Sequence, residues 1–390
     1  MATRVRSYSK INLGLAIGPV RADGFHGLAT LYQTLALHDV VTVEARRRQG
    51  TGHRDQGTGK TQRTATGEQG TGGSNRASVI SLTSNHSGVP TDERNTAWKM
   101  VALALERLGI SADVKIHIQK DLPVQGGMGA GSANAAAALI GLERELGLEL
   151  GQPGALSETA RLEMAAQVGS DVPLFLVGGA VLGTGRGEIV SAMPDLPATP
   201  CVVAVPEVGV STPRAFQEWD RRQGTGIREQ RITGLTGGAA VDRLEALSHV
   251  YASVLQASAS DSSGIVRGIR PESKQGGFEG NVPEEESAQN GLAGNPLLAL
   301  VRTGMENDFE QVVFPQHPSL RDIKRVLMGP PDSETAIYAA LSGSGSALFG
   351  LYHSEAAAAS AQQRVQAFGC MAIVTSTLPR TEYWGEMFVE

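Results

Sequence analysis

Residues 122–142 read LPVQGGMGAGSANAAAALIGL, and this stretch decides the fold that we predict for the chain. Closely spaced glycines are followed by an alanine-rich run that is typical of a helix. A glycine turn that opens a helix exposes backbone N–H groups where the peptide dipoles concentrate positive charge. The stretch therefore predicts a phosphate-binding loop. The alternative is a loop that only caps a well-packed helix.

The surrounding pattern excludes two common nucleotide-binding loops. No Gly-Lys-Ser or Gly-Lys-Thr closes the loop, so a P-loop fold is disfavoured. The spacing is not GxGxxG after a first strand, which disfavours a dinucleotide-binding start. Strict alternation at 112–119 predicts a strand directly before the loop. The local order is therefore strand, phosphate loop, helix.

Length and composition indicate a two-domain protein that acts on a small molecule. The chain has 390 residues, of which 41% are hydrophobic and 19% charged. A net charge of -6 does not favour a nucleic-acid partner. Cys201 and Cys370 have no CxxC spacing, so neither a disulfide framework nor a zinc site is indicated. We read no signal peptide and no membrane-spanning segment, and we expect a cytoplasmic protein without a membrane partner.

Periodicity predicts a mixture of strands and helices that fits an α+β fold. The expected strands lie at 7–17, 40–45, 78–84, 112–119, 201–205 and 372–376. The expected helices lie at 95–108, 132–146, 157–168, 212–219, 307–313, 320–327 and 354–368, with a possible helix at 241–255. Asn95 is the expected N-cap of the first helix.

Two polar segments interrupt this pattern. Residues 46–77 contain almost no apolar side chains, and the tetrapeptide Gln-Gly-Thr-Gly begins at 49, 56 and 69 and again at 223. A segment without apolar residues cannot offset its ordering entropy, so we expect a flexible loop there. Residues 221–295 are also mostly polar and rich in Gly and Ser, and we expect a second inserted loop.

Motifs in a fixed order resemble the GHMP kinase superfamily. They are KINLGL with RADGFHGL, then LPVQGGMGAGSANAAAAL, then GSDVPLFLVGGAVLGTGRGE, and finally LSGSGSALFG. The resemblance implies an ATP-binding N-terminal domain at 1–195, ribosomal-protein-S5-domain-2-like, with the insertion 46–77. It also implies a ferredoxin-like C-terminal domain at 196–390, with the insertion 221–295.

The first motif narrows the resemblance to the branch of the superfamily that acts in isoprenoid biosynthesis. Its acceptor is cytidine diphosphate methylerythritol, and the γ-phosphoryl group of ATP passes to the tertiary 2-hydroxyl of the methylerythritol unit. The resemblance therefore implies a small-molecule kinase that uses ATP and Mg²⁺.

The resemblance places the phosphates of ATP on the glycine loop. The implied ATP-binding residues are Pro123, Gly126, Gly127, Met128, Gly129, Ala130, Gly131, Ser132 and Ala133. Ala133 stands where related proteins have a serine, and alanine offers no oxygen to a hard cation. The sequence therefore leaves the magnesium ligands unknown.

Lys10 and Asp171 match the catalytic lysine and aspartate of the superfamily. From the residues alone, Asp171 is a turn or capping residue and Lys10 a surface lysine. In the kinase interpretation the carboxylate orients the hydroxyl and takes its proton. The ammonium keeps the carboxylate ionised and offsets charge on the transferring phosphoryl group.

The resemblance also implies a site for the cytidine substrate. Asn12 matches a polar residue of the site, His26 the histidine that reads the cytosine edge, and Phe25 stands where the family often has Tyr. Phe216 corresponds to a second stacking aromatic, with core packing as the alternative. Ser344 and Gly345 are expected to close the phosphate side of the cleft.

Three functional hypotheses remain at this point. The first is the active kinase, as a monomer or homodimer. The second is a nucleotide-binding sensor or partner that has lost efficient catalysis, which the altered glycine loop would explain. The third is a kinase for homoserine, mevalonate or a sugar. The RADGFHGL motif and Phe216 favour the cytidine substrate, because the other acceptors give no reason for two base-stacking rings.

Overall fold

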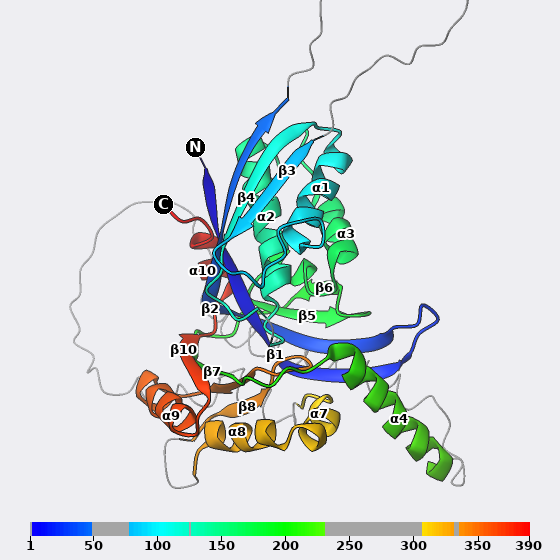
Figure 1. The fold of residues 1–390 in the computed structure, drawn as a ribbon, viewed down its shortest axis with the longest axis vertical. Helices are drawn as coiled ribbons and strands as arrows, with labels where there is room; N and C mark the ends of the chain where they lie inside the picture. Colours follow the sequence, from blue (N-terminus) through cyan, green and yellow to red (C-terminus); the bar gives the residue numbers. More distant parts are fainter. Residues whose placement is uncertain (1, 49–77, 125, 231–305, 331–334) are drawn as a thin grey trace, which may run out of the picture.

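The computed structural model of the protein describes residues 2–48, 78–124, 126–230, 306–330 and 335–390, with only the backbone described at 224–230 (Figure 1). Two sheets with helices packed against them make up this part of the chain. This arrangement confirms the predicted α+β class. No helix among the described residues is both long and apolar enough to cross a membrane.

The larger sheet has six strands in the order β3-β4-β2-β5-β6, with β1 paired to β2. Its strands are β1 (Thr3–Val20), β2 (His26–Arg47), β3 (Val79–Ser84), β4 (Ala112–Gln119), β5 (Ala180–Thr184) and β6 (Ile189–Ala192). All neighbours are antiparallel except β3 and β4. β1 and β2 form a hairpin much longer than the predicted strands at 7–17 and 40–45, because its far end packs on the second sheet.

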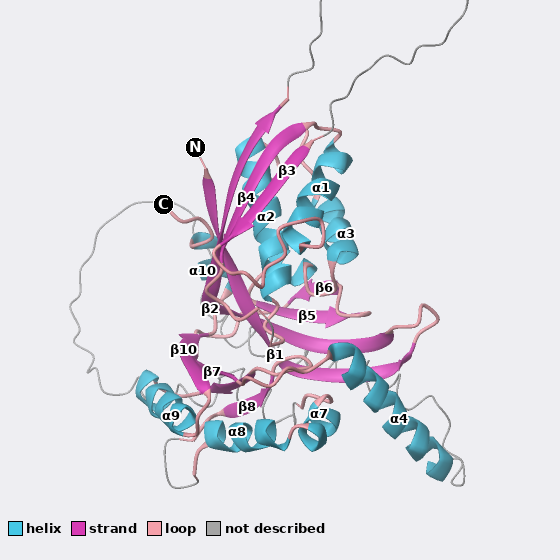
Figure 2. Cartoon of the chain, viewed as in Figure 1, coloured by secondary structure: helices cyan, strands magenta, loops and turns pink. Residues whose placement is uncertain are grey.

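Three helices pack beside this sheet (Figure 2). They are α1 (Thr96–Leu108), α2 (Ala130–Leu146) and α3 (Glu158–Val168), each within two residues of its predicted bounds. The alanines of α2 let its backbone approach the sheet closely. At Gly141 an added Cβ would lie 2.7 Å from a methyl carbon of Val43. A larger side chain on this face would force α2 away from the strands.

Local signals in the sequence explain these elements well. Val114, Ile116 and Ile118 of β4 are buried while the residues between them are exposed, as their alternation predicts. The Asn95 side chain caps α1 by accepting a hydrogen bond from Ala97 N. The predicted strand, loop and helix order around residues 112–146 is therefore confirmed.

The smaller sheet is antiparallel, in the order β10-β7-β9-β8. Its strands are β7 (Pro200–Val205), β8 (Tyr338–Leu341), β9 (Leu348–Leu351) and β10 (Met371–Ser376). Its helices are α4 (Thr212–Gln230), α7 (Glu310–Gln316), α8 (Pro318–Met328) and α9 (Glu355–Ala367). The elements follow one another as strand β7, helices α4, α7 and α8, strands β8 and β9, helix α9 and strand β10. This order is the one predicted for a ferredoxin-like domain.

Strand β7 is buried on both faces, which explains its continuous apolar sequence. Val202 and Ala204 pack in the cluster that contains α8 and α9. Cys201 and Val203 pack with Leu13 of the long hairpin in another cluster. The two domains therefore share a hydrophobic interface along this strand. The boundary that we predict at 195/196 falls in the connection between β6 and β7.

The C-terminal segment returns to the first domain, which the sequence did not indicate. It contains α10 (Arg380–Gly385), beside the beginning of β1 in Figure 1. Tyr383 and Met387 are buried in the core of the first domain. Arg6 N donates to the carbonyl of Met387 at 2.8 Å. The first domain is therefore completed by residues from the far end of the chain.

Three sequence predictions need correction. Helix α4 continues through Gln230, so residues 221–230 are helical and not the start of an inserted loop. Helix α7 begins three residues after the predicted 307, because the backbone there pairs with β1: Asn307 forms a β-bridge with Leu15, and Asp308 N donates to the carbonyl of Leu15 at 2.9 Å. The predicted insertion 46–77 starts too early, because Arg46 and Arg47 still pair with β4 as the end of β2. Its residues 49–77 and the possible helix at 241–255 lie outside the described residues.

Candidate active site

Strand β1 places Lys10 in the interior of the molecule, close to Asp171. The Lys10 side chain is buried, at a register irregularity in the pairing of β1 with β2. Its ammonium lies 3.3 Å from Oδ2 of Asp171 and donates to Oδ1 of Asn12 at 2.7 Å. Residues 10 and 12 share one face of the strand, as the period of two requires. The structure therefore brings together three residues that the sequence analysis singled out.

Asp171 lies in the connection between α3 and the short 3₁₀ helix Pro173–Leu176. Its side chain is 32% exposed, so one side of the carboxylate remains open to solvent. Oδ1 accepts a hydrogen bond of 3.0 Å from the Tyr32 hydroxyl, while Oδ2 faces the ammonium. Each carboxylate oxygen thus has its own donor on the protein. A carboxylate with an ordered position and an open side can receive a proton from a bound hydroxyl group.

Tyr32 was not among the predicted site residues. It lies in the apolar part of β2, where nothing in the sequence distinguishes a site tyrosine from a core tyrosine. Burial, and after it the charge of Asp171, raises the pKa of Tyr32 well above its ordinary value. Its hydroxyl therefore stays protonated and acts as a hydrogen-bond donor.

A short hydrogen-bond chain orients Asn12. Its Nδ2 donates to the Thr30 hydroxyl at 2.8 Å, and that hydroxyl donates to the carbonyl of Gly14 at 2.9 Å. Since Thr30 uses its only proton on the carbonyl, it can only accept from Asn12. The amide oxygen of Asn12 is therefore the atom that faces Lys10.

The glycine loop is held between β1 and the segment that joins β8 to β9. Lys10 N donates to the carbonyl of Met128 at 3.0 Å, and Ala347 N donates to the carbonyl of Gly126 at 3.1 Å. A Cβ on Gly127 would lie 2.1 Å from the carbonyl oxygen of Ser342. A side chain at this position would therefore collide with the backbone. The backbone φ of +78° is a second reason why glycine is required there.

The first turn of α2 offers backbone donors. The first helical hydrogen bond runs from Ala133 N to the carbonyl of Gly129 at 2.9 Å. In the described part of the chain, the N–H groups of Ala130, Gly131 and Ser132 have no acceptor. These donors and the helix dipole make an anion-binding end.

Two alanines of the loop do not face this end. Ala130 and Ala133 are buried among core side chains, so their methyl groups point away from the open side of the loop. Ser132 is half-buried at the rim, and a Cβ on Gly169 would lie 3.9 Å from its hydroxyl oxygen. Ser132 therefore lies beside the connection that carries Asp171.

The entrance to the loop is held by a buried ion pair. The Lys120 ammonium lies 2.6 Å from Oδ2 of Asp39, and both side chains are buried. Oδ1 of Asp39 accepts from the backbone N–H groups of Asp121 and Leu122 at 2.9 and 2.7 Å. Pro123, one of the predicted ATP-binding residues, follows directly and is half-buried. Asp39 was not predicted, since its partners follow a strand that is distant in the sequence.

The segment after β8 reaches the same centre. Ser344 shares a hydrogen bond of 2.6 Å with the Thr212 hydroxyl at the start of α4. A Cβ on Gly343 would lie 3.6 Å from Nζ of Lys10 and 3.4 Å from Oδ1 of Asn12. The backbone at 343, which the sequence analysis did not select, thus lies beside the ammonium. Gly345 follows in the same turn, against the side chain of Leu341.

His26 and Phe216, two of the residues predicted to bind the base, lie together in the structure. Their rings stack with centroids 4.9 Å apart and planes 5° apart. His26 Nδ1 lies 2.9 Å from the carbonyl of Gly18, and Nε2 lies 3.2 Å from Oδ1 of Asp220. Asp220 was not predicted, although it follows Phe216 by one helical turn of α4.

Phe25 lies at the tip of the long hairpin and is 53% exposed. The Arg186 guanidinium lies 4.8 Å from the centre of its ring. Arg186 belongs to the turn between β5 and β6, so this turn and the hairpin tip meet at Phe25. Arg186 was not among the predicted site residues.

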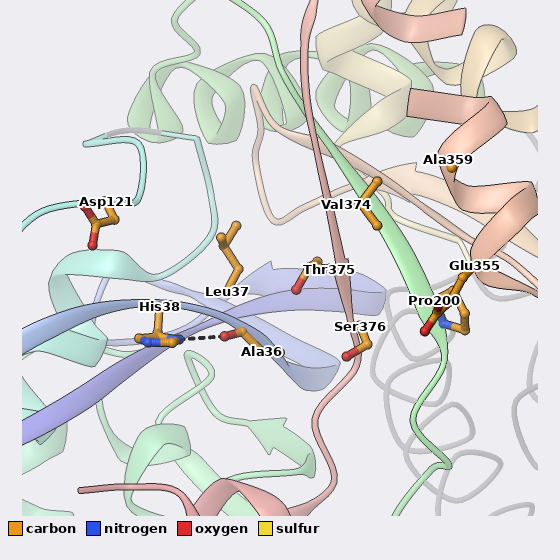
Figure 3. A pocket seen from close by; sticks show the side chains of 10 residues that line it. All are labelled: Ala36, Leu37, His38, Asp121, Pro200, Glu355, Ala359, Val374, Thr375 and Ser376. Atoms are coloured by element: carbon orange, nitrogen blue, oxygen red, sulfur yellow. Dashed lines mark hydrogen bonds between the residues drawn. The ribbon is translucent and has the colours of Figure 1, made fainter. Parts of the chain in front are cut away.

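A hollow of about 770 Å³ lies elsewhere in the structure (Figure 3). It is lined by Ala36, Leu37, His38, Asp121, Pro200, Glu355, Ala359, Val374, Thr375 and Ser376. One hydrogen bond joins lining residues, from the ring of His38 to the carbonyl of Ala36. Neither Lys10 nor Asp171 is among the residues that line this hollow. We therefore assign the candidate active site to the group formed by Lys10, Asn12, Tyr32 and Asp171.

Comparison with known families and proteins finds that the chain is similar to kinases. Residues 95–179 match the family described as GHMP kinases N terminal domain, and residues 294–369 match GHMP kinases C terminal. The 4-diphosphocytidyl-2-C-methyl-D-erythritol kinase of Caldicellulosiruptor saccharolyticus is 34% identical over 216 residues, which are 55% of this chain and 62% of that protein. The protein of the same name from Leifsonia xyli subsp. xyli is 34% identical over 246 residues, which are 61% of this chain and 68% of that protein. The matched part of the chain thus covers less than two thirds of the length of the first relative and slightly more than two thirds of the length of the second.

Solved structures confirm the fold. A crystal structure of 4-(cytidine 5'-diphospho)-2C-methyl-D-erythritol kinase has a TM-score of 0.57 at 23% identity, covering 96% of this chain and 98% of that one. Homoserine kinase from Cytophaga hutchinsonii has the same TM-score at 17% identity, covering 97% of this chain and 95% of that one. The predicted two-domain kinase fold is therefore confirmed, and the fold alone does not choose between these acceptors.

Proposed function

Because this chain belongs to the 4-diphosphocytidyl-2-C-methyl-D-erythritol kinase family, we propose that it phosphorylates the 2-hydroxyl of 4-diphosphocytidyl-2-C-methyl-D-erythritol, with ATP as donor. The product would be the 2-phosphate, an intermediate in isoprenoid biosynthesis. The observation that carries the proposal is the Lys10–Asp171 pair, 3.3 Å apart, beside a glycine loop whose N–H groups at the start of α2 have no acceptor among the described residues.

Asp171 is the proposed base. Its carboxylate accepts the proton of the 2-hydroxyl, and the oxygen forms a bond to the γ-phosphorus of ATP. The bond from that phosphorus to the bridging oxygen breaks, and ADP leaves with its electrons. Lys10 keeps Asp171 ionised before transfer and offsets negative charge on the phosphoryl group during transfer.

The start of α2 is the proposed site for the phosphates of ATP. The N–H groups at Ala130, Gly131 and Ser132 can donate to phosphate oxygens. The described residues contain no cluster of three acidic, His or Cys side chains that could hold a metal by themselves. Mg²⁺ usually binds through substrate phosphates and water with few protein ligands, so the hydroxyl of Ser132 fits as its ligand. When bound, the ion neutralises phosphate charge.

The base site would be formed by residues of the hairpin tip and α4. The Phe216 ring covers His26, and the Arg186 guanidinium covers the ring of Phe25. A pyrimidine that stacks on Phe25 or Phe216 therefore replaces one of these contacts. Such stacking contributes about 1–3 kcal/mol per base, enough to favour a cytidine substrate over homoserine or mevalonate.

The test is ATP- and magnesium-dependent phosphorylation by the purified protein. The acceptors are 4-diphosphocytidyl-2-C-methyl-D-erythritol, homoserine and mevalonate, assayed side by side. We expect transfer to the cytidine compound alone. Transfer only to another acceptor would refute the proposed substrate, and nucleotide binding without any transfer would favour a sensor.

The Asp171→Asn variant tests the proposed base. We expect its kcat to fall by about 10²–10⁴-fold, with ATP affinity unchanged. An equal loss of ATP binding and transfer would show that Asp171 acts mainly in binding or folding.

A further inference from the structure

We propose that Tyr32 is a positioning residue that fixes the orientation of the Asp171 carboxylate. The inference rests on the proposed function, because it assigns Tyr32 a role in the same transfer. Its basis is the 3.0 Å hydrogen bond from the Tyr32 hydroxyl to Oδ1 of Asp171.

The two residues differ in how firmly the fold holds them. Tyr32 lies in β2, paired with Asn12 of β1 on one side and with Val181 of β5 on the other. Asp171 lies in a connection outside any helix or strand. A rigid strand in the middle of the sheet can therefore fix a carboxylate that its own backbone leaves less constrained.

The packing around Tyr32 directs its hydroxyl towards Asp171. A Cβ on Gly183 would lie 2.5 Å from the ring, and a Cβ on Gly187 would lie 2.5 Å from the hydroxyl oxygen. The hairpin of β5 and β6 can approach the ring this closely only because both residues are glycine. The hydroxyl is thus confined on that side, and Tyr32 as a whole is only 2% exposed.

The chemistry of the three groups assigns each a different task. The Lys10 ammonium engages Oδ2 and Tyr32 engages Oδ1, so together they restrain rotation of the carboxylate about its terminal bond. Because burial keeps the Tyr32 hydroxyl protonated, it serves as a donor and does not compete for the proton of the acceptor. Fixing the base before the substrate arrives reduces the reorganisation needed for transfer.

The first experiment compares Tyr32→Phe with a matched control. Tyr32→Phe removes the hydroxyl and keeps the ring, so we expect kcat to fall about 30-fold, the effect of losing one hydrogen bond to a charged group. KM for ATP and for the acceptor should stay within about twofold. The control is Tyr352→Phe, which removes another buried hydroxyl, donating to Leu327 at 2.8 Å in the second domain. We expect it to lower Tm without a change in kcat.

A double-variant cycle separates positioning from general structural support. If Tyr32 acts through Asp171, adding Tyr32→Phe to Asp171→Asn should reduce the residual rate by less than about twofold. A further loss as large as that in the wild-type background would overturn the proposal. So would an unchanged kcat in Tyr32→Phe alone.

A crystal structure of Tyr32→Phe gives a result that does not depend on turnover. We expect the Asp171 carboxylate to rotate or to occupy more than one rotamer, with Lys10 in place. An unchanged, singly ordered carboxylate would refute the positioning role. If the wild-type protein transfers phosphate to none of the acceptors, the proposed function fails, and this structure still decides whether Tyr32 orients Asp171.

Discussion

Gly127 shows how the lack of a Cβ atom at one residue can determine the geometry of the candidate site. Its missing side chain lets the loop lie against the carbonyl of Ser342, whose hydroxyl in turn donates to the carbonyl of Gly127 at 3.0 Å. The phosphate loop of one domain is thus joined to a turn of the other. Because Lys10 and Gly343 lie beside this junction, a displacement of the loop would change the environment of the ammonium.

We expect Gly127→Ala to destabilise the protein far more than Gly147→Ala. Both glycines have positive φ, which costs alanine about 1–2 kcal/mol. Only at Gly127 would the new methyl also overlap a backbone atom, since nothing lies within 4 Å of the Cβ position at Gly147. Urea unfolding should show a loss near that range for Gly147→Ala and a larger one for Gly127→Ala. Equal losses of unfolding free energy in the two variants would mean that the backbone at Gly127 and Ser342 can shift apart at little cost.

At the scale of the element, the entrance to the glycine loop depends on the end of β4. Asp39 of β2 holds three successive residues there, through the ammonium of Lys120 and two backbone N–H groups. The alternation of β4 predicts where this strand runs. It does not predict Asp39, because a buried pair between distant strands leaves no local pattern.

Asp39→Asn should be strongly destabilising. It leaves the buried ammonium of Lys120 uncompensated, which costs about 3–5 kcal/mol. Asp113→Asn is the control, because its ion pair with Arg48 lies at the surface, where solvent screening leaves such a pair little effect on stability. Equilibrium unfolding measures both, and KM for ATP should rise only in Asp39→Asn. Adding Lys120→Met to Asp39→Asn should restore stability if the unpaired charge is the cause.

The contact between α2 and α3 should make stability depend on pH. Burial raises the pKa of Glu143 from about 4.5 to about 7, although the guanidinium of Arg161, 3.1 Å away, opposes the shift. The folded state therefore binds the proton more tightly than the unfolded state. The resulting stabilisation is present below pH 4.5 and is lost as the pH rises through 7. It amounts to at most about 3 kcal/mol.

Unfolding measured from pH 4.5 to 8 checks this dependence. The free energy of unfolding should decline over that range in the wild-type protein and decline less in Glu143→Gln. Glu106→Gln, an exposed position on α1, serves as the control and should retain the wild-type slope. A slope unchanged in Glu143→Gln would assign the dependence to other groups.

At the scale of the whole molecule, the first domain is built from two separate parts of the sequence, because the C-terminal segment packs into its core. Tyr383 packs against Tyr8, with ring centroids 5.1 Å apart, and its hydroxyl donates to the carbonyl of Phe175 at 2.6 Å. The guanidinium of Arg380 donates to the carbonyls of Gly178, Ala180 and Met193. The last helix therefore supports the segment that follows Asp171.

Tyr383→Ala should loosen the first domain selectively. Truncating a buried aromatic ring costs about 3–5 kcal/mol, and Tyr383 is buried in the first core. Hydrogen exchange should accelerate in β1 and α2 and remain slow in α9 of the second domain. Phe368→Ala removes an exposed ring and should leave both domains unchanged. Uniform acceleration would mean that the domains unfold as one unit.

The sequence predicted what depends on local patterns and on ordered motifs. Helices α1, α2 and α3 followed from periodicity and caps, and the motifs placed Lys10, Asn12 and Asp171, which the structure brings together. Tyr32 was missed because a tyrosine in an apolar strand has no distinctive spacing. The path of the C-terminal segment was missed because a contact between Arg6 and Met387 depends on the tertiary fold and not on any neighbouring residue.

The return of the C-terminal segment to β1 also bears on synthesis. The side chain of Arg6 donates to the carbonyl of Phe388, 382 residues later in the chain. At ribosomal rates of about 5–20 residues per second, β1 emerges roughly 20–75 s before its partner exists. Until then the hydrophobic surface that Tyr383 and Met387 will cover is open to the cell. We therefore expect nascent chains stalled between the domains to require a chaperone, although all strands of the larger sheet have been made.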